Sequence, residues 1–212
     1  YQYTRKPPKV TKPRGNVVVR LCSIECSFAQ PLSGPQNETF REDIEGWSKI
    51  APQLYVWDYV TDFHNYLQPQ PNMRVLGPNL RFFRDHNVIA MFEQGDAHCN
   101  IGDFVRLRAW LLAHLMWDPS RDENDLIREF LQGYYGPAAP HLEAYLNVIH
   151  DAAERSGAHI GCFESNTNAW LTLDDITKAS RHMAKAEAAV AGDELLAPRV
   201  RRDRMPLDFV WL

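Results

Sequence analysis

The sequence predicts an α/β fold: the C-terminal part of a (β/α)8 TIM-type barrel, followed by an all-helical region. Three apolar segments rich in β-branched residues recur at intervals of roughly 35 residues, the spacing of strands in βα repeats. Segments with helical periodicity lie between them, and each strand-like segment ends in an acidic residue. No strand of comparable strength follows. We therefore expect later βα units of a barrel over residues 1–102 and a helical C-terminal region over residues 103–212.

The first 15 residues predict a loop, because Pro7, Pro8 and Pro13 lack an amide donor and fix the backbone. A buried parallel strand directly after this loop needs a neighbour on each side. We therefore expect the N-terminal remainder of the same barrel to be its partner. The chain begins at Tyr1 without a signal-like apolar stretch, so the sequence does not predict a cellular location.

The chain from residue 16 to residue 95 reads as strand, helix, strand, helix and strand. The first helix is predicted from the spacing of four apolar residues, and Pro52 ends it. Pro78 is a suitable first-turn residue for the second helix. The five expected elements cover residues 16–28, 40–50, 54–63, 78–86 and 87–92.

The chain beyond Gly95 changes to long segments with helical character. A strongly apolar helix is stopped by Trp117, Asp118 and Pro119. The expected helices cover residues 104–116, 122–133, 138–156 and 173–191, with a final short helix to Leu212.

Glu25, Asp58 and Glu93 are the candidate catalytic residues. Each follows at least four apolar strand residues, where an unpaired carboxylate is costly to bury. Because the carboxyl ends of parallel strands meet at one edge of a sheet, the three acids are expected to lie together. The alternative is that each acid forms a structural ion pair with an arginine such as Arg5, Arg14 or Arg20.

A cluster of carboxylates is suited to glycoside hydrolysis, in which one carboxyl protonates the leaving oxygen and another attacks the sugar or activates water. Aromatic side chains beside the acids offer flat faces for sugar rings. The candidate substrate-binding residues are Trp57, Tyr59, Tyr66, Gln94 and His98. For Trp57 and Tyr59 the alternative is packing between sheet and helices.

A metal site is a further alternative, since His64, His98 and Cys99 could act together with Asp58 or Glu93. Their spacing matches no recognised ligand pattern, so we expect no metal and no cofactor. The four cysteines are expected to be reduced or buried rather than to form a disulfide framework.

The overall composition argues against two classes of partner. The formal net charge is −4 and acids and bases are interspersed, which gives no broad positive surface for nucleic acid. No apolar run approaches the roughly 18 residues needed to span a bilayer.

Four segments carry a resemblance to a known family: Leu54 to Tyr59, Leu76 to Phe83, Phe92 to Gly95, and Tyr134 to Ala139. In this order they resemble a family of uncharacterised bacterial glycosidase-like proteins, over most of the chain. In that family the module often follows an N-terminal domain of the α-glucuronidase type. The resemblance implies an oligosaccharide or polysaccharide substrate and a secreted or periplasmic location.

A more distant similarity is to the α-glucuronidases, whose barrel is followed by a helical region with a Trp-Asp-Pro segment like that in Leu115 to Pro119. This similarity implies that Asp58 and Glu93 assist water in an inverting reaction. The general acid would come from an earlier strand, unless Glu25 serves. The expected function is hydrolysis of a glycosidic bond, with a uronic acid or an amino sugar as the expected substrate unit. The alternatives are a non-catalytic carbohydrate-binding domain on a degenerate barrel and a metal-dependent hydrolase.

Overall fold

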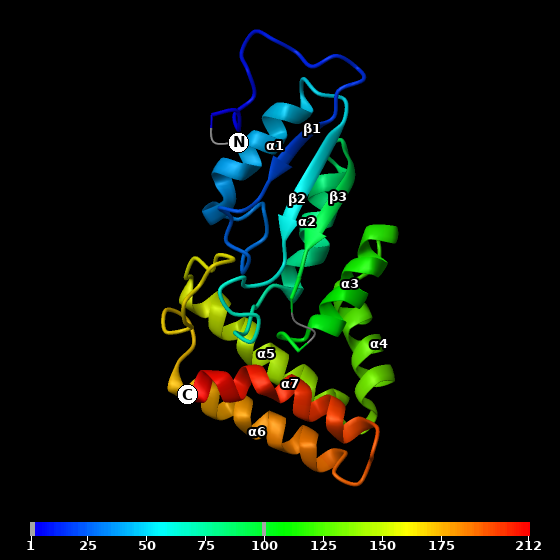
Figure 1. The fold of residues 1–212 in the computed structure, drawn as a ribbon, viewed down its shortest axis with the longest axis vertical. Helices are drawn as coiled ribbons and strands as arrows, with labels where there is room; N and C mark the ends of the chain where they lie inside the picture. The colour runs from blue at the N-terminus through cyan, green and yellow to red at the C-terminus, as the bar shows by residue number, and fades with distance from the viewer. Residues whose placement is uncertain (1–2, 99–100) are drawn as a thin grey trace.

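The computed structural model describes residues 3–98 and 101–212. In this part of the chain three strands alternate with helices, and a series of further helices follows the third strand (Figure 1). The strands are β1 (Val19–Cys22), β2 (Leu54–Tyr59) and β3 (Val88–Gln94). The α-helices are α1 (Glu38–Ser48), α2 (Met73–Arg84), α3 (Val105–Trp117), α4 (Glu123–Tyr135), α5 (Ala139–Ser156), α6 (Leu173–Ala189) and α7 (Leu196–Trp211).

The described strands form one open parallel sheet in the order β1-β2-β3. The prediction of a (β/α)8 TIM-type barrel is therefore wrong. A barrel requires continued strand pairing until the sheet closes, whereas the described chain after Gln94 continues into helix α3 and adds no fourth strand. The local apolar pattern correctly predicted strands and their parallel direction, but it holds no information on closure.

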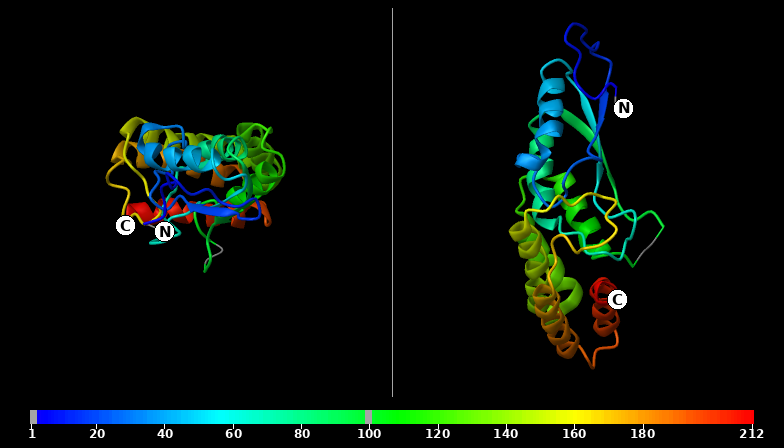
Figure 2. Two further views of the ribbon diagram at one scale, coloured as in Figure 1. Left: turned by 90° about the horizontal axis from the view of Figure 1, so that it is seen from above. Right: turned by 90° about the vertical axis from the view of Figure 1, so that its left-hand side faces the viewer.

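Helices α1 and α2 cover one face of the sheet (Figure 2). Burial alternates along β2, so that Leu54, Val56 and Asp58 are buried while the residues between them are half-buried. Phe40 and Ile44 of α1 share a hydrophobic cluster with Leu54 and Val56. No helix of the described part lies on the opposite face, which leaves it open (Figure 2).

The helices after the sheet pack around a second, larger hydrophobic cluster. Helices α5, α6 and α7 lie side by side at one end of the molecule, and α3 and α4 connect them to the sheet (Figure 1). Leu76 and Leu80 of α2 belong to this cluster as well. Helix α2 therefore packs on the sheet with one side and on the helical region with the other.

Several element boundaries differ from the prediction; strand β2, for example, ends at Tyr59 rather than at Phe63. Strand β1 ends at Cys22, because the chain turns where the N–H of Cys26 bonds the carbonyl of Ser23 at 2.8 Å. Helix α2 begins before Pro78, which lies inside the helix rather than at its first turn. The last helix is not short, since α7 has 16 residues.

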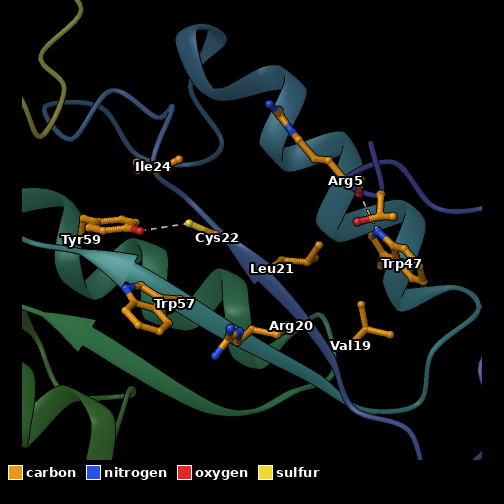
Figure 3. A pocket seen from close by; sticks show the side chains of 10 residues that line it. Arg5, Val19, Arg20, Leu21, Cys22, Ile24, Trp47, Trp57 and Tyr59 are labelled. Atoms are coloured by element: carbon orange, nitrogen blue, oxygen red, sulfur yellow. Dashed lines mark hydrogen bonds between the residues drawn. The ribbon is translucent and has the colours of Figure 1, made fainter. Parts of the chain in front are cut away.

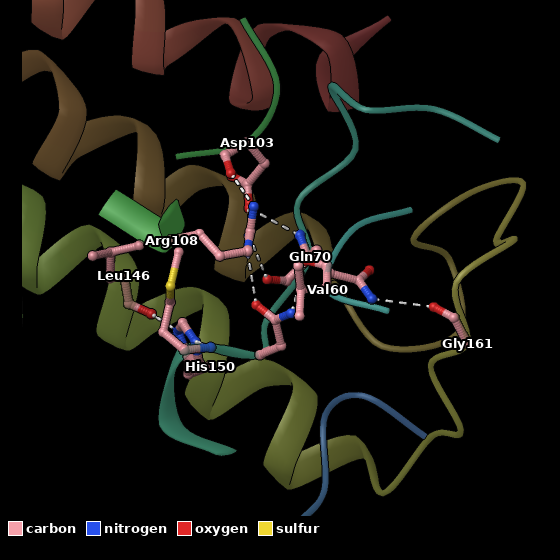
Figure 4. Close-up of polar contacts among 9 residues, drawn as sticks. Val60, Gln70, Asp103, Arg108, Leu146, His150 and Gly161 are labelled. Atoms are coloured by element: carbon pink, nitrogen blue, oxygen red, sulfur yellow. Dashed lines mark hydrogen bonds and ion pairs between the residues drawn. The ribbon is translucent and has the colours of Figure 1, made fainter. Parts of the chain in front are cut away.

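A buried polar network joins the helical region to the loop after β2 (Figure 4). The guanidinium of Arg108 on α3 pairs with Asp103 at 3.0 Å and also donates to Asn72 Oδ1 at 3.0 Å and to the carbonyl of Gln70 at 3.3 Å. His150 of α5 contacts the same loop through the backbone of Met73. These bonds fix the loop that begins at the carboxyl end of β2.

Among the helices that the structure describes, none has the length and apolar character needed to cross a membrane. The thiols of Cys26 and Cys162 are buried, and the thiol of Cys22 donates to the Tyr59 hydroxyl at 3.3 Å. Cys99 lies outside the described residues.

Candidate functional site

The open face of the sheet carries aromatic side chains. Trp57 and Tyr59 lie on this face because they alternate with Val56 and Asp58 along β2. Figure 3 shows both side chains on the same side of the strand, next to Arg20 and Cys22 of β1. Trp57 is therefore not in the core between sheet and helices, whereas Tyr59 is partly buried and packs against the edge of that core.

Neighbouring side chains on the same face fix the Trp57 ring. Its Nε1 donates to Gln94 Oε1 at 2.6 Å. The ring of Phe92 meets it edge-on, with 5.0 Å between centroids and an interplanar angle of 89°. The guanidinium of Arg20 lies over the indole, 5.1 Å from its centroid. Trp57 is thus held in one orientation by one residue of β1 and two of β3.

A cavity of about 670 Å³ lies along β1 and is lined from both faces of the sheet, since Leu21 and Trp47 of the helix-covered side also border it. Its polar and aromatic lining side chains include Arg5, Arg20, Trp47, Trp57 and Tyr59, and none of its described lining residues is acidic (Figure 3). Arg5 pairs with Glu25 and Asp43, whereas Arg20 forms no ion pair with a described residue. The cavity has the size of a small-ligand site, and Arg20 gives its wall a positive charge that no ion pair with a described residue offsets.

The aromatic surface continues from Tyr59 towards the loops. Phe63 meets Tyr59 edge-on at 5.6 Å and Tyr66 at 6.0 Å between ring centroids. Phe163, from the loop between α5 and α6, lies 5.8 Å from Phe63 and is 47% exposed. Tyr66 is therefore connected to Tyr59 through one intervening ring, and both halves of the chain contribute to this surface.

Asp58 and Glu93 lie opposite each other in the register of β2 and β3. They are brought together as expected, on neighbouring parallel strands about 4.8 Å apart. Their side chains are on the helix-covered face, opposite to Trp57. Asp58 is only 5% exposed. The acids and the aromatic residues of β2 therefore belong to two different faces of one sheet.

The two acids differ in their hydrogen bonds. Asp58 Oδ1 accepts bonds from the Ser23 hydroxyl and from the backbone N–H of Tyr59, the latter at 2.9 Å. Glu93 Oε2 is buried and has no hydrogen-bond partner in the described part of the chain. Burial raises the pKa of Asp58 to about 6, against the lowering effect of the Ser23 bond. Burial, and then the charge of Asp58, raise the pKa of Glu93 well above its usual range.

Glu93 borders a second cavity, of about 420 Å³, between the end of β3 and helix α3. Asp96 and Arg108 are among its other lining residues. Asp58 is not part of this wall. Of the pair, Glu93 is therefore the residue that faces open space, and Asp58 lies behind it.

Glu25 is placed differently from the other two candidate acids. It lies beyond the end of β1, is exposed, and forms an ion pair with Arg5. Arg5 also pairs with Asp43 on α1 and donates to Thr39 at 2.8 Å. This arrangement corresponds to the alternative considered from the sequence, a structural ion pair that fastens the N-terminal loop to α1.

The described candidate metal ligands, His64 and His98, lie at the surface of the molecule. His64 and His98 are exposed, and the His64 ring lies 5.5 Å from that of Phe163. Over residues 3–98 and 101–212, no group of three or more His, Cys, Asp and Glu side chains is arranged to hold a metal ion. Cys99, the third predicted ligand, lies outside these residues.

Sequence reasoning missed four residues that shape these sites: Ser23, Arg20, Phe92 and Phe163. Two-residue alternation along β1 and β3 was the available signal for Arg20 and Phe92, because it places them on the same face as Trp57 once the register is known. Phe163 is far away in sequence, and no local pattern links it to β2.

Comparison with protein families identifies a family for most of the chain. Residues 1–147 match the model described as Domain of unknown function (DUF4838). This chain belongs to the DUF4838 family. The match covers the whole sheet of this DUF4838 protein and helices α1 to α4, together with the first part of α5. The expectation of an uncharacterised family is thereby confirmed. Comparison with curated proteins and comparison with solved structures each gave no match.

Proposed function

We propose that this DUF4838 protein binds carbohydrate on the open face of its sheet. The observation that carries the proposal is the Trp57 ring, held by Gln94, Phe92 and Arg20 beside a cavity of about 670 Å³. Sugar rings pack their C–H faces on fixed aromatic rings, and hydroxyl groups bond the polar side chains around them. Tyr59 and Tyr66 extend this surface towards the loops.

The charge of the cavity favours an acidic sugar among the classes considered. Arg20 has no carboxylate partner in the described chain and lies over the indole, so its guanidinium can pair with a sugar carboxylate. An amino sugar would place a second positive charge next to Arg20. A uronic acid unit therefore fits this surface better than an amino sugar, in keeping with the resemblance to α-glucuronidases.

The test is calorimetric titration of the full chain with a uronic-acid-containing oligosaccharide and with its neutral counterpart. Trp57→Ala should weaken binding by about tenfold or more, because it removes the stacking surface. Arg20→Gln should reduce the preference for the acidic oligosaccharide. Trp211→Ala is the matched control, since Trp211 is an exposed tryptophan on α7, where it donates to Ser180.

Equal binding by the Trp57→Ala variant and the wild-type protein would refute the proposal. Loss of binding in both tryptophan variants would also count against it, because the effect would then not come from the open face.

Glycoside hydrolysis is the second candidate function, and the Asp58–Glu93 pair favours it. Two neighbouring carboxyls, one of them facing a cavity, are the groups needed for proton transfer to a glycosidic oxygen. This candidate predicts release of reducing sugar from an acidic glycan, and loss of that release in Glu93→Gln. The binding proposal predicts that Glu93→Gln leaves affinity unchanged, so the two candidates are distinguishable.

A further inference from the structure

Asp58 and Glu93 are equivalent in the strand register but unequal in their surroundings. Asp58 Oδ1 accepts two hydrogen bonds, from Ser23 and from the backbone of Tyr59. The buried Oε2 of Glu93 accepts none from a described residue. Hydrogen bonds donated to a carboxylate stabilise its charged form, whereas burial without such bonds stabilises the neutral acid.

We propose that Ser23 is a positioning residue for this pair: its hydroxyl holds Asp58 as the carboxylate, so that Glu93 carries the proton when the pair holds only one. The position of the proton is a property of the resting protein. Its catalytic meaning rests on the hydrolysis proposed above.

The backbone holds Ser23 in place for this role. Ser23 is the first residue after β1 and is 1% exposed. Its N–H donates to the carbonyl of Trp57 at 3.2 Å, which continues the β1–β2 ladder by one residue. The residue next in sequence to Trp57 is Asp58, so this bond sets the serine side chain beside the carboxylate that it contacts.

Two thiols lie within electrostatic range of Asp58, and neither competes for the proton. They are Cys26, after β1, and Cys162, in the loop after α5. Burial raises the pKa of both thiols, that of Cys162 to about 12, so both are neutral at neutral pH.

Two charged residues line the same cavity as Glu93: Asp96, from the segment after β3, and Arg108 of α3. The Arg108 guanidinium is bonded to Asp103 and to backbone carbonyls. Burial raises the pKa of Asp96, and the charged neighbour that raises the pKa of Glu93 is Asp58 rather than Asp96. Asp58 thus remains the charged group that acts directly on Glu93.

The proposal assigns Glu93 as the proton donor in hydrolysis. The Glu93 proton would pass to the leaving glycosidic oxygen, which also takes the electron pair of the broken C–O bond. Water would supply the hydroxyl group to the anomeric carbon, and its remaining proton would return to the Glu93 carboxylate through solvent. The negative charge of Asp58 favours this return, since two adjacent carboxylates repel each other.

The experiment is a pH titration of the full chain labelled with 13C at the Asp and Glu carboxyl carbons, followed by NMR. Asp58→Asn and Glu93→Gln assign the two signals. We expect the Glu93 signal to titrate at higher pH than the Asp58 signal. Ser23→Ala should raise the pKa of Asp58 by about one pH unit and reduce or reverse the difference between the two.

Ser27→Ala is the matched control, because Ser27 is equally buried in the same segment and its hydroxyl accepts from the N–H of Ile160 at 3.3 Å. Ser27→Ala should leave both titrations in place, and Ser23→Thr, which keeps the hydroxyl, should restore the wild-type order. A wild-type Asp58 that titrates above Glu93 would overturn the proposal, as would equal effects of the two alanine variants. The titration needs no glycan, so its outcome is independent of sugar binding.

Discussion

His150 on α5 accepts a hydrogen bond from the backbone N–H of Met73, with 3.1 Å between Nε2 and the amide nitrogen. Its other nitrogen, Nδ1, donates to the carbonyl of Leu146 at 2.7 Å (Figure 4). Because Nε2 must be an acceptor, the pair of bonds requires the neutral imidazole. Burial lowers the pKa of His150 to about 4.

The first prediction is that His150 makes the protein less stable in acid. Its folded-state pKa lies below the unfolded value of about 6.5, so the unfolded chain binds more protons between these limits. The contribution of neutral His150 to the free energy of unfolding is complete above pH 6.5. It is lost as the pH falls towards 4, by up to about 3 kcal/mol. Urea unfolding at several pH values should show a shallower acid loss for His150→Gln than for the wild type.

The effect of His150 must be measured as a difference between variants, because buried acids change the free energy of unfolding with pH in the opposite direction. The pKa of Asp58 and that of Asp203 are raised to about 6, so their contributions fall as the pH rises through this range. His159→Gln is the control, since His159 is exposed. The prediction is wrong if His150→Gln and His159→Gln show the same acid profile.

The second prediction concerns two buried tyrosines in the helical region. The Tyr135 hydroxyl donates to Asp203 Oδ2 at 2.6 Å, whereas the Tyr145 hydroxyl has no partner in the described chain. Tyr135→Phe should lower the free energy of unfolding by about 1.5–3 kcal/mol at pH 7, because it leaves a buried carboxylate without its donor. Tyr145→Phe should be neutral or stabilising.

The cost of Tyr135→Phe should also depend on pH. Burial raises the pKa of Asp203 to about 6, so the carboxyl is largely neutral at pH 5 and the lost bond matters less there. Denaturant unfolding of both variants at pH 5 and pH 7 checks this. Equal costs for the two tyrosines, or a larger cost at pH 5, would contradict it.

The third prediction concerns Arg108, which pairs with Asp103 inside the protein. Arg108→Met should destabilise the fold by about 3–5 kcal/mol, because it leaves the buried Asp103 unpaired. Adding Asp103→Asn should recover part of this loss. Arg128→Met, which removes a partly exposed arginine from surface pairs, should cost less than about 1 kcal/mol.

Thermal and urea unfolding of these three variants provide the measurement. Hydrogen exchange should increase in the loop after β2, since Arg108 donates to the carbonyl of Gln70 in that loop. A double variant no more stable than Arg108→Met would show that the buried charge of Asp103 is not the cause.

Local patterns predicted the strands well because burial of alternate residues is a local property. The segments around Val19, Leu54 and Val88 form parallel strands in the expected order, and Asp58 meets Glu93. Closure of the sheet is not a local property, and the barrel prediction failed there. The predicted length of β1 was also wrong, because the chain turns at Ser23 before it reaches Glu25.

The site was harder to predict than the strands. Adjacent residues of a strand have side chains on opposite faces, so Trp57 and Asp58 are close in sequence but separated by the sheet. The pairing of Glu25 with Arg5 depends on how the N-terminal loop folds back onto α1. Neither periodicity nor spacing predicts that path.

The adjacency of Trp57 and Asp58 limits which changes β2 can tolerate during evolution. Replacing either side chain alters one face and leaves the other in place. Inserting or deleting one residue upstream in the strand would exchange the faces, turning the indole towards the helices and the carboxylate towards solvent. We therefore expect natural variants of β2 to differ by substitution, and length variation to be confined to the connecting loops.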